Sequence, residues 1–197
     1  MGVSLAACSK PSDKPKVTAE EAAAALAGGE GAAAEKGPDN VAQDLLDKLT
    51  ASSDAAVAAS LEEEVYSAWL VSGSPTVDIL MKRATDAQES EDLELARDMY
   101  DRALMIRPQY AEAWNRRALL FFNDGKYDEA IADLETTLQY EPRHFGAWIG
   151  LAMIFESMDY PDAALKAYRK ALMIHPFAEA AKQGEKRLIP IVEGRAL

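Results

Sequence analysis

The sequence predicts an all-α fold built from repeated pairs of helices, and three observations carry this prediction. The first is a period of 34 residues, because the segments 77–110, 111–144 and 145–178 align without a gap. A fixed period of this length indicates a repeat array. The second is side-chain type, since small, aromatic and proline residues return at the same places in successive segments. The third is their helical spacing within each half of a segment.

The first half of each unit spaces its apolar residues along one face of a helix. Trp114, Ala118 and Phe121 fall at i, i+4 and i+7, which places them on the same side of a helix. In the next unit Trp148 and Phe155 occupy the matching places. We therefore expect a first helix in each unit with small residues at its close contacts and large ones between neighbouring units.

The second half of each unit predicts a second, antiparallel helix. Ala130, Leu134 and Leu138 share a face in the middle unit. Gly125 breaks the first helix because glycine tolerates the positive φ that ends one. Pro161 stands where a second helix begins, a position that needs no N–H donor. A proline closes each second helix: Pro108, Pro142 and Pro176.

This pattern resembles the tetratricopeptide repeat, which has Trp at position 4, small residues at 8 and 20, an aromatic residue at 11 and Pro at 32. It departs from that pattern at position 7, where Arg83 and Arg117 replace the usual Leu, and unit 77–110 has Leu80 and Ala87 at positions 4 and 11. The resemblance implies a right-handed superhelix of helix–turn–helix units. We expect the two arginines to pair with carboxylates of a neighbouring helix while their stems pack, or else to reach into the groove.

The segments on either side of the three units also show helical patterns. Segment 41–76 is expected to be a degenerate helical pair, either a fourth unit or an N-terminal cap with the same topology. Segment 179–197 is expected to contain a C-terminal capping helix that ends before Pro190, followed by a tail. Terminal units are atypical in such arrays because one of their faces meets water.

The N-terminal residues predict a lipid anchor and a tether. In segment 1–8, the string Leu-Ala-Ala-Cys ending at Cys8 and followed by Ser9 resembles a bacterial lipobox, so Cys8 is the expected lipidation site. Segment 9–40 is rich in Lys, Pro, Ala, Gly, Ser and Glu and contains no aromatic residue. Such a composition offers little to bury, and we expect a low-complexity tether outside the core.

Composition limits the classes of partner. The chain of 197 residues carries 33 Asp and Glu against 21 Lys and Arg, which argues against a general nucleic-acid binder because that affinity comes from basic contacts to phosphates. It contains no apolar run of the ~18 to 20 residues that a membrane-spanning helix needs. Contact with a membrane is therefore expected only through the lipid.

The sequence contains none of the residue patterns that carry common chemistry. We find no Gly-rich phosphate loop, no Cys and His spacing for a metal and no nucleophile paired with a base. His144 and His175 lie in turns between units, where we expect them to help terminate helices. The run from Glu62 to Glu64 is interpreted as a solvated helix face. The sequence thus predicts no enzyme, no cofactor and no metal site.

The resemblance also implies where a partner would bind, because first helices line a concave groove in this family. The residues at groove positions that we expect to contact a partner are Asn115, Arg116, Leu119, Phe122, Ile149 and Met153. Four of them would form an apolar floor, with Arg116 at its side. Family members that grip C-terminal carboxylates have basic residues where Gly146 and Gly150 stand here, so that clamp is not expected.

The predicted function is a non-enzymatic scaffold for protein–protein interaction, anchored to a membrane through Cys8 and facing the bacterial periplasm. One alternative is a cytoplasmic adaptor or co-chaperone in which residues 1–40 form a disordered tail. Another is an enzyme accessory or weak hydrolase built on the array. The apolar floor could also be covered by the chain's own tether or by a second copy rather than by another protein.

Overall fold

The computed structural model describes residues 40–194, and this part of the chain is all helical, with no strand. The predicted lipobox and most of the predicted tether lie outside the described residues. The helices are α2 (Asn40–Ala51), α3 (Ala55–Trp69), α4 (Pro75–Glu89), α5 (Leu93–Ile106), α6 (Ala111–Asn123), α7 (Tyr127–Tyr140), α8 (Phe145–Ser157), α9 (Pro161–Ile174) and α10 (Glu179–Val192).

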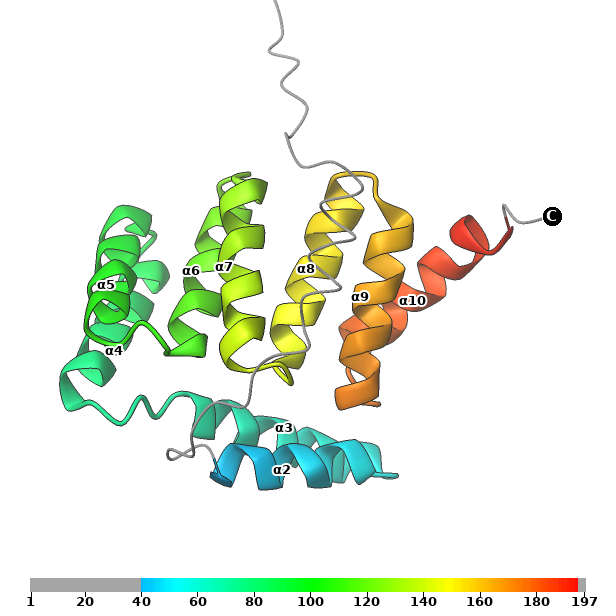
Figure 1. Ribbon diagram of the computed structural model, residues 1–197, viewed down its shortest axis with the longest axis horizontal. Helices are drawn as coiled ribbons and strands as arrows, with labels where there is room; N and C mark the ends of the chain where they lie inside the picture. The colour runs from blue at the N-terminus through cyan, green and yellow to red at the C-terminus, as the bar shows by residue number, and fades with distance from the viewer. Residues whose placement is uncertain (1–39, 195–197) are drawn as a thin grey trace, which may run out of the picture.

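Three helical pairs stack side by side, as Figure 1 shows from green to orange: α4 with α5, α6 with α7, and α8 with α9. The first helices also touch one another directly, α6 against α8 and α8 against α10, which the second helices do not match. The first helices therefore form the inner layer of the array and the second helices the outer layer. The predicted all-α repeat fold is confirmed.

The turn inside each pair uses the same backbone conformation at the same place. Glu91, Gly125 and Asp159, each 34 residues from the next, have φ of 61°, 71° and 62°. This left-handed conformation ends the first helix of each pair, and only the middle unit uses glycine for it. Pro161 starts α9 at its first position, as Pro75 starts α4.

The repeated tryptophan and proline are joined by a hydrogen bond. The indole Nε1 of Trp114 donates to the carbonyl oxygen of Pro108 at 2.8 Å, and that of Trp148 donates to Pro142 at 3.1 Å. Each indole thus satisfies its own N–H and a carbonyl from the turn between units. This contact fixes where α6 and α8 start relative to the preceding second helix.

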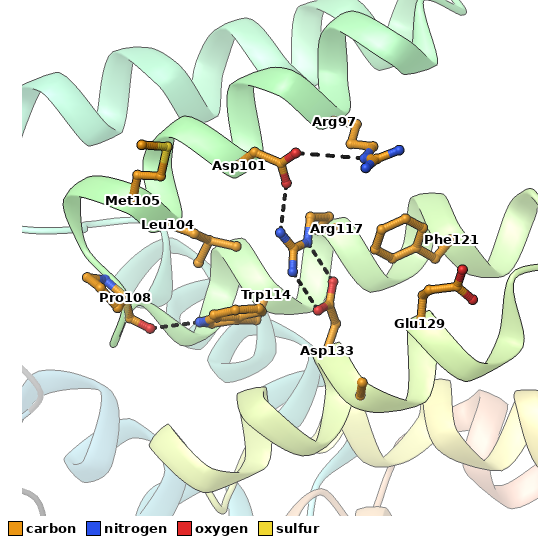
Figure 2. A pocket seen from close by; sticks show the side chains of 11 residues that line it. Arg97, Asp101, Leu104, Met105, Pro108, Trp114, Arg117, Phe121, Glu129 and Asp133 are labelled. Carbon is orange, nitrogen blue, oxygen red and sulfur yellow. Dashed lines mark hydrogen bonds and ion pairs between the residues drawn. The ribbon is translucent and has the colours of Figure 1, made fainter. Parts of the chain in front are cut away.

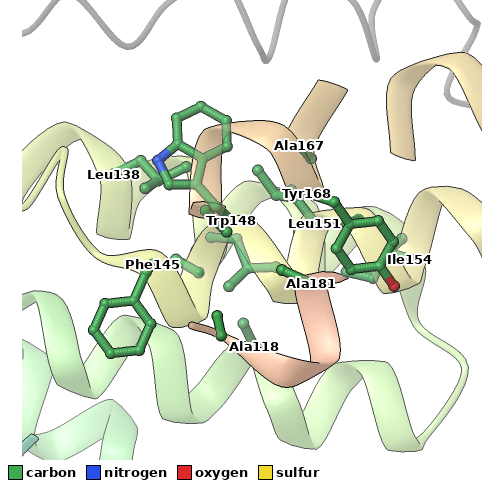
Figure 3. Close-up of a cluster of buried hydrophobic side chains, with 14 of the residues drawn as sticks. Ala118, Leu138, Phe145, Trp148, Leu151, Ile154, Ala167, Tyr168 and Ala181 are labelled. Carbon is green, nitrogen blue, oxygen red and sulfur yellow. The ribbon is translucent and has the colours of Figure 1, made fainter. Parts of the chain in front are cut away.

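The core consists of small residues at the close helix contacts and large ones between units. The residues at positions 8 and 20 are all at most 1% exposed: Ala84, Ala118, Ala152, Ala96, Ala130 and Ala164. Figure 3 shows the larger cluster, in which the Trp148 ring of α8 lies beside Leu138 of α7. In the same cluster, Tyr168 of α9 packs against Gly184 of α10. A second, smaller cluster belongs to α4, α5 and part of α6, so the core divides between the first unit and the rest.

The helical pair α2–α3 does not stack on α4 as a further repeat unit would. It runs crosswise along one edge of the array (Figure 1), the edge formed by the turns between units at 107–110, 141–144 and 175–178. We call this the inter-unit edge. Arg143 pairs with Asp47 of α2 at 2.6 Å, and the Thr50 hydroxyl donates to the carbonyl of Ile174 at 2.8 Å. The expected helical pair is present, but it is not stacked on the array as a fourth repeat unit.

Because α2–α3 lies elsewhere, the described residues do not cover the side of α4 on which a preceding repeat unit would stack. Ile79 is 56% exposed, whereas the matching Ala113 and Ala147 are fully buried under the preceding second helix. Arg83 is likewise exposed and forms no ion pair within residues 40–194. The pairing expected of both arginines holds for Arg117, which bonds two aspartates, and is wrong for Arg83.

Helix α10 caps the other end of the array and is longer than expected. It continues through Pro190 to Val192 rather than ending before the proline. Because Pro190 stands in the last turn, it removes a single backbone bond near an end that frays anyway. Gly184 faces the ring of Tyr168 so closely that a Cβ there would overlap it, which lets α10 pack against α9.

Candidate protein-binding groove

The predicted groove residues lie on α6 and α8, in the inner layer of the array. Leu119 and Met153 occupy the same position in neighbouring units and are 51% and 43% exposed. Phe122 and Ile149 are less exposed than these two, because they are partly buried against the core. The centroid of the Phe122 ring also lies 5.9 Å from that of Tyr127. The exposed apolar floor is therefore narrower than the four residues expected from the sequence.

The polar side of the groove is centred on a buried carboxylate. Glu112 is 2% exposed and accepts hydrogen bonds from Nε of Arg116 at 2.6 Å and from Nδ2 of Asn115 at 3.3 Å. The Arg116 side chain is 27% exposed. The predicted basic contact in the groove is thus already neutralised by the chain itself.

His144 completes this cluster and begins a helix rather than ending one. Its Nδ1 accepts the backbone N–H of Ala147 at 3.0 Å, which makes it the N-cap of α8. Nε2 must then carry the proton, and it lies 3.1 Å from Oε2 of Glu112. Burial pushes the pKa of Glu112 upward, but the hydrogen bonds and charges of His144 and Arg116 outweigh it and lower that pKa. Glu112 is therefore ionised at neutral pH.

The pair α2–α3 closes one end of the groove with aromatic side chains. The ring of Trp69 stacks on that of His144 with centroids 4.1 Å apart, and the ring of Tyr66 meets that of Phe145 edge-on at 5.3 Å. A Cβ at position 146 would lie 2.9 Å from the Tyr66 hydroxyl, so Gly146 leaves room for this ring. Burial first, and then the charges of Glu112 and Glu62, raise the pKa of Tyr66, which stays neutral.

The second glycine in the groove also has a structural reason. A Cβ at Gly150 would lie 3.2 Å from the side chain of Leu134. Leu134 belongs to α7, so the missing side chain lets the preceding unit pack closely. Neither glycine position has room for a basic side chain, because Tyr66 fills the space beside Gly146 and Leu134 fills the space beside Gly150.

Hydrogen bonds between polar side chains lie on both sides of the exposed residues Leu119 and Met153, in the first and the third unit. The hydroxyl of Tyr100 donates to Gln88 in the first unit, and that of Tyr168 donates to Glu156 at 2.6 Å in the third. Glu156 also pairs with Arg187 of α10 at 3.0 Å. The middle unit has Phe122 and Leu134 at the same two positions. The groove is therefore apolar at its centre and polar on both sides.

His175 and Glu62 tie α3 to the last turn between units. Nε2 of His175 lies 3.1 Å from Oε2 of Glu62, while its Nδ1 is buried without a hydrogen-bond partner. Glu62 is therefore more than part of a solvated face, although Glu63 and Glu64 are exposed as expected. The contact explains why the helical pair lies along the inter-unit edge.

Neither a metal site nor a membrane span is found in the part of the chain that the structure describes. No group of three His, Cys, Asp or Glu side chains within residues 40–194 could hold a metal ion. No helix in the same range is long and apolar enough to cross a bilayer. Cys8 lies outside the described residues, so its lipidation remains a prediction.

Sequence reasoning missed the contribution of α3 to this groove. Tyr66 and Trp69 lie at least 75 positions before Phe145 and His144, the residues whose rings they contact. Local periodicity cannot predict such a placement. The one available signal was Gly146, because glycine on the first turn of a buried helix indicates close approach by another group. The pairing of Glu112 with His144 joins the start of α6 to the start of α8, and it left no local signal.

Comparison with known proteins agrees with this architecture. Residues 81–135 and 116–181 match the model of the tetratricopeptide repeat. A TPR repeat-containing protein of Rhizobium etli is 37% identical over 150 residues, which cover 76% of this chain and 74% of that protein.

Solved structures show the same fold. The Sgt2 TPR domain from Aspergillus fumigatus superposes with a TM-score of 0.58 at 24% identity, covering 62% of this chain and 83% of that one. The first TPR of Spaghetti (RPAP3), solved with an HSP90 peptide SRMEEVD, gives 0.58 at 16% identity, covering 61% and 95%. With its 34-residue units, its paired helices and these matches, the chain belongs to the tetratricopeptide repeat family.

Proposed function

We propose that this chain is a non-enzymatic scaffold that holds an apolar segment of a partner protein against α6 and α8. The fold is that of a protein-interaction scaffold. The observation that carries the finer proposal is the exposed pair Leu119 and Met153, which lie at the same position of neighbouring inner helices and are about half exposed. Contiguous exposed apolar surface marks contact sites, and methionine adapts to partners of varied shape.

The charges of the groove favour an apolar segment over an acidic tail. The Spaghetti domain is bound to SRMEEVD, a peptide with three carboxylate side chains. Here each groove cation is paired within the chain: Lys82 with Asp86, Arg116 with Glu112 and Arg187 with Glu156. A partner carboxylate at Arg116 would have to compete with the buried carboxylate of Glu112, which would then lose its charged partner.

We also propose that the scaffold is anchored in the bacterial cell envelope through acyl chains on Cys8. The lipobox-like string and the tether-like composition of 9–40 support this, together with the bacterial relative. A single acyl chain binds membranes weakly, so stable attachment needs more than one. The alternative remains a cytoplasmic adaptor.

The groove is tested by placing a photo-crosslinking amino acid at position 119 in a bacterium that expresses the full chain. The crosslinked partner is identified by mass spectrometry, and its affinity is then measured with Leu119→Glu and Met153→Glu. We expect each substitution to weaken binding at least tenfold with unchanged helicity. Met173→Glu is the matched control, because Met173 is 71% exposed on the outer helix α9. Equal binding by the groove variants and the control would refute the proposal.

The anchor is tested by expression behind a complete export signal. We expect labelled palmitate to enter the wild-type protein and the protein to fractionate with membranes. Cys8→Ser should abolish both. A wild-type protein that takes up no label would leave the cytoplasmic alternative.

A further inference from the structure

A second open surface lies on the outer side of the array, between α5 and α7. It is a cleft of about 680 Å³, with α6 at its base. Figure 2 shows its lining, in which apolar side chains gather near Trp114 and the charged side chains lie beside them around Arg117. We call it the outer cleft, and the residues that matter below are Met105, Trp114, Arg117, Phe121, Glu129 and Asp133.

The next junction along the stack provides an internal control. There, Trp148 and Phe155 hold the same repeat positions as Trp114 and Phe121, and they are 4% and 0% exposed. Trp114 and Phe121 are only half-buried. Since residue type and repeat position are the same, the openness of the outer cleft belongs to this junction and is no general feature of the repeat.

The cause is a charged network where the next junction has apolar side chains. Arg117 and Asp133 stand where Leu151 and Ala167 are fully buried in the following unit. Arg117 bonds Asp133 through Nε and Nη2, both at 2.7 Å, and Asp101 of α5 through Nη1 at 2.7 Å. The network bridges α5, α6 and α7 without closing the space between α5 and α7. The apolar core divides at this same junction.

The open wall of the outer cleft is apolar and aromatic. Met105 at its rim is 82% exposed. The guanidinium of Arg117 lies 4.6 Å from the ring centroid of Trp114 and 5.7 Å from that of Phe121. The guanidinium of Arg97 also lies 5.6 Å from the Phe121 centroid. These cations hold the two rings in place, and the ring surface that they leave uncovered is the apolar part of the cleft.

The charge of the lining favours a cationic ligand. Three acids, Asp101, Glu129 and Asp133, stand against two bases, Arg97 and Arg117, which leaves one negative charge in excess. The bonds of Arg117 to two aspartates use its charge within the network. Glu129 is exposed at the cleft. The whole chain carries a formal charge of −12, so its long-range field also attracts cations.

We propose that the outer cleft binds a basic, apolar segment of a partner protein. An aromatic or aliphatic side chain of that segment packs against Trp114 and Phe121, and a neighbouring Lys or Arg pairs with Glu129. The outer cleft faces away from the groove of inner helices, so the two surfaces can be filled at the same time. This site does not depend on the proposed groove function.

The test uses defined peptides and the full chain labelled with 5-fluorotryptophan. Fluorine NMR reports Trp114 apart from Trp69 and Trp148 after assignment by substitution of each with Phe. The probe is a capped peptide of sequence Lys-Ala-Phe-Leu-Lys-Ala. One control peptide has Glu in place of both Lys residues, and the other has Ser in place of Phe and Leu. We expect the basic, apolar peptide to shift the Trp114 signal saturably, with Trp148 unchanged and both control peptides at least tenfold weaker.

Charge substitution in the protein separates this site from any other. Glu129→Lys should weaken the basic peptide roughly fivefold or more, because an exposed ion pair contributes up to about that factor and the reversal adds repulsion. Glu63→Lys makes the same charge change on α3 and should have no effect. Leu119→Glu should also have none, which distinguishes failure here from failure of the groove.

Several results would overturn the proposal. The first is that the Trp114 signal shows no saturable shift up to millimolar peptide. The second is that the acidic peptide binds as tightly as the basic one. The third is that Glu129→Lys does not change the affinity for the basic peptide. A Trp114 signal that moves with protein concentration alone, together with a dimer in light scattering, would assign the outer cleft to a second copy instead.

Discussion

Replacing Glu112 with Gln should destabilise the fold although the two side chains have nearly the same shape. Glu112 is buried and accepts hydrogen bonds from Arg116, Asn115 and His144. A glutamine offers one oxygen and one NH2 group. Arg116 and His144 both act as donors here, because Nδ1 of His144 accepts from Ala147. Whichever way the amide turns, one of these donors faces another donor.

The expected loss is about 3 kcal/mol. A buried donor left without an acceptor costs roughly 1 to 3 kcal/mol, and breaking a buried charged pair costs about 3 to 5 kcal/mol. The lower end applies because Arg116 is 27% exposed and can turn toward water. In a helical domain of this size the melting temperature should fall by roughly 6 to 12 °C.

Urea unfolding at pH 7 measures the difference, and its pH dependence checks the cause. The pKa of Glu112 is lowered in the folded state from its ordinary 4.5, so its contribution is full above that pH. It is lost as pH falls through the lower folded value. The gap between wild type and Glu112→Gln should therefore narrow on acidification. Exposed Glu63→Gln should change stability by less than about 0.5 kcal/mol. A loss below about 1 kcal/mol, or a gap independent of pH, would refute the reasoning.

Two further substitutions test the packing. Trp148→Ala should lower the free energy of unfolding by about 3 to 5 kcal/mol, because Trp148 is a buried aromatic residue. Trp114 is only half-buried, so Trp114→Ala should lower it clearly less in the same denaturant melts. The reverse order would contradict the different openness of the two junctions. Gly184→Ala should lower the free energy of unfolding by about 1 to 3 kcal/mol, because the added Cβ overpacks against Tyr168. Gly194→Ala is the neutral control, because a Cβ there meets no atom within 4 Å. A Gly184→Ala variant as stable as wild type would mean that α10 shifts freely on α9.

The array itself could be predicted from sequence because its contacts are local and repeated. Ala118 and Ala130 lie twelve residues apart, on the two helices of one unit, and both are buried. The period repeats this arrangement in the next unit with Ala152 and Ala164. The position of α2–α3 could not be predicted in this way. It depends on pairs such as Trp69 with His144 and Glu62 with His175, which are 75 and 113 residues apart, and no periodicity encodes them.

The groove was predictable only as far as repeat position determines exposure. Leu119 and Met153 are exposed as expected, because no described side chain covers their place on the inner face. Phe122 and Ile149 share that face but are partly buried, because their side chains pack against the core cluster. Such differences follow from the exact fit between units, which residue type alone does not determine.

Position 7 of the three units shows how the stack is ordered. It is Arg83 in the first unit, Arg117 in the second and Leu151 in the third, and the residue becomes progressively more buried in that order. Arg83 has no preceding helix packed on it among the described residues, Arg117 has a helix that supplies Asp101, and Leu151 meets an apolar one.

The chain before α4 is attached elsewhere, to the turns at 141–144 and 175–178. In a simple solenoid each unit contacts only its neighbours, and stability is a sum along the stack. Here α3 also bonds Tyr110 through the carbonyl of Trp69 at 3.0 Å, so one helix contacts all three turns of the inter-unit edge. The pair α2–α3 therefore couples units that do not touch one another, and unfolding of the array should be more cooperative than the repeat architecture alone implies.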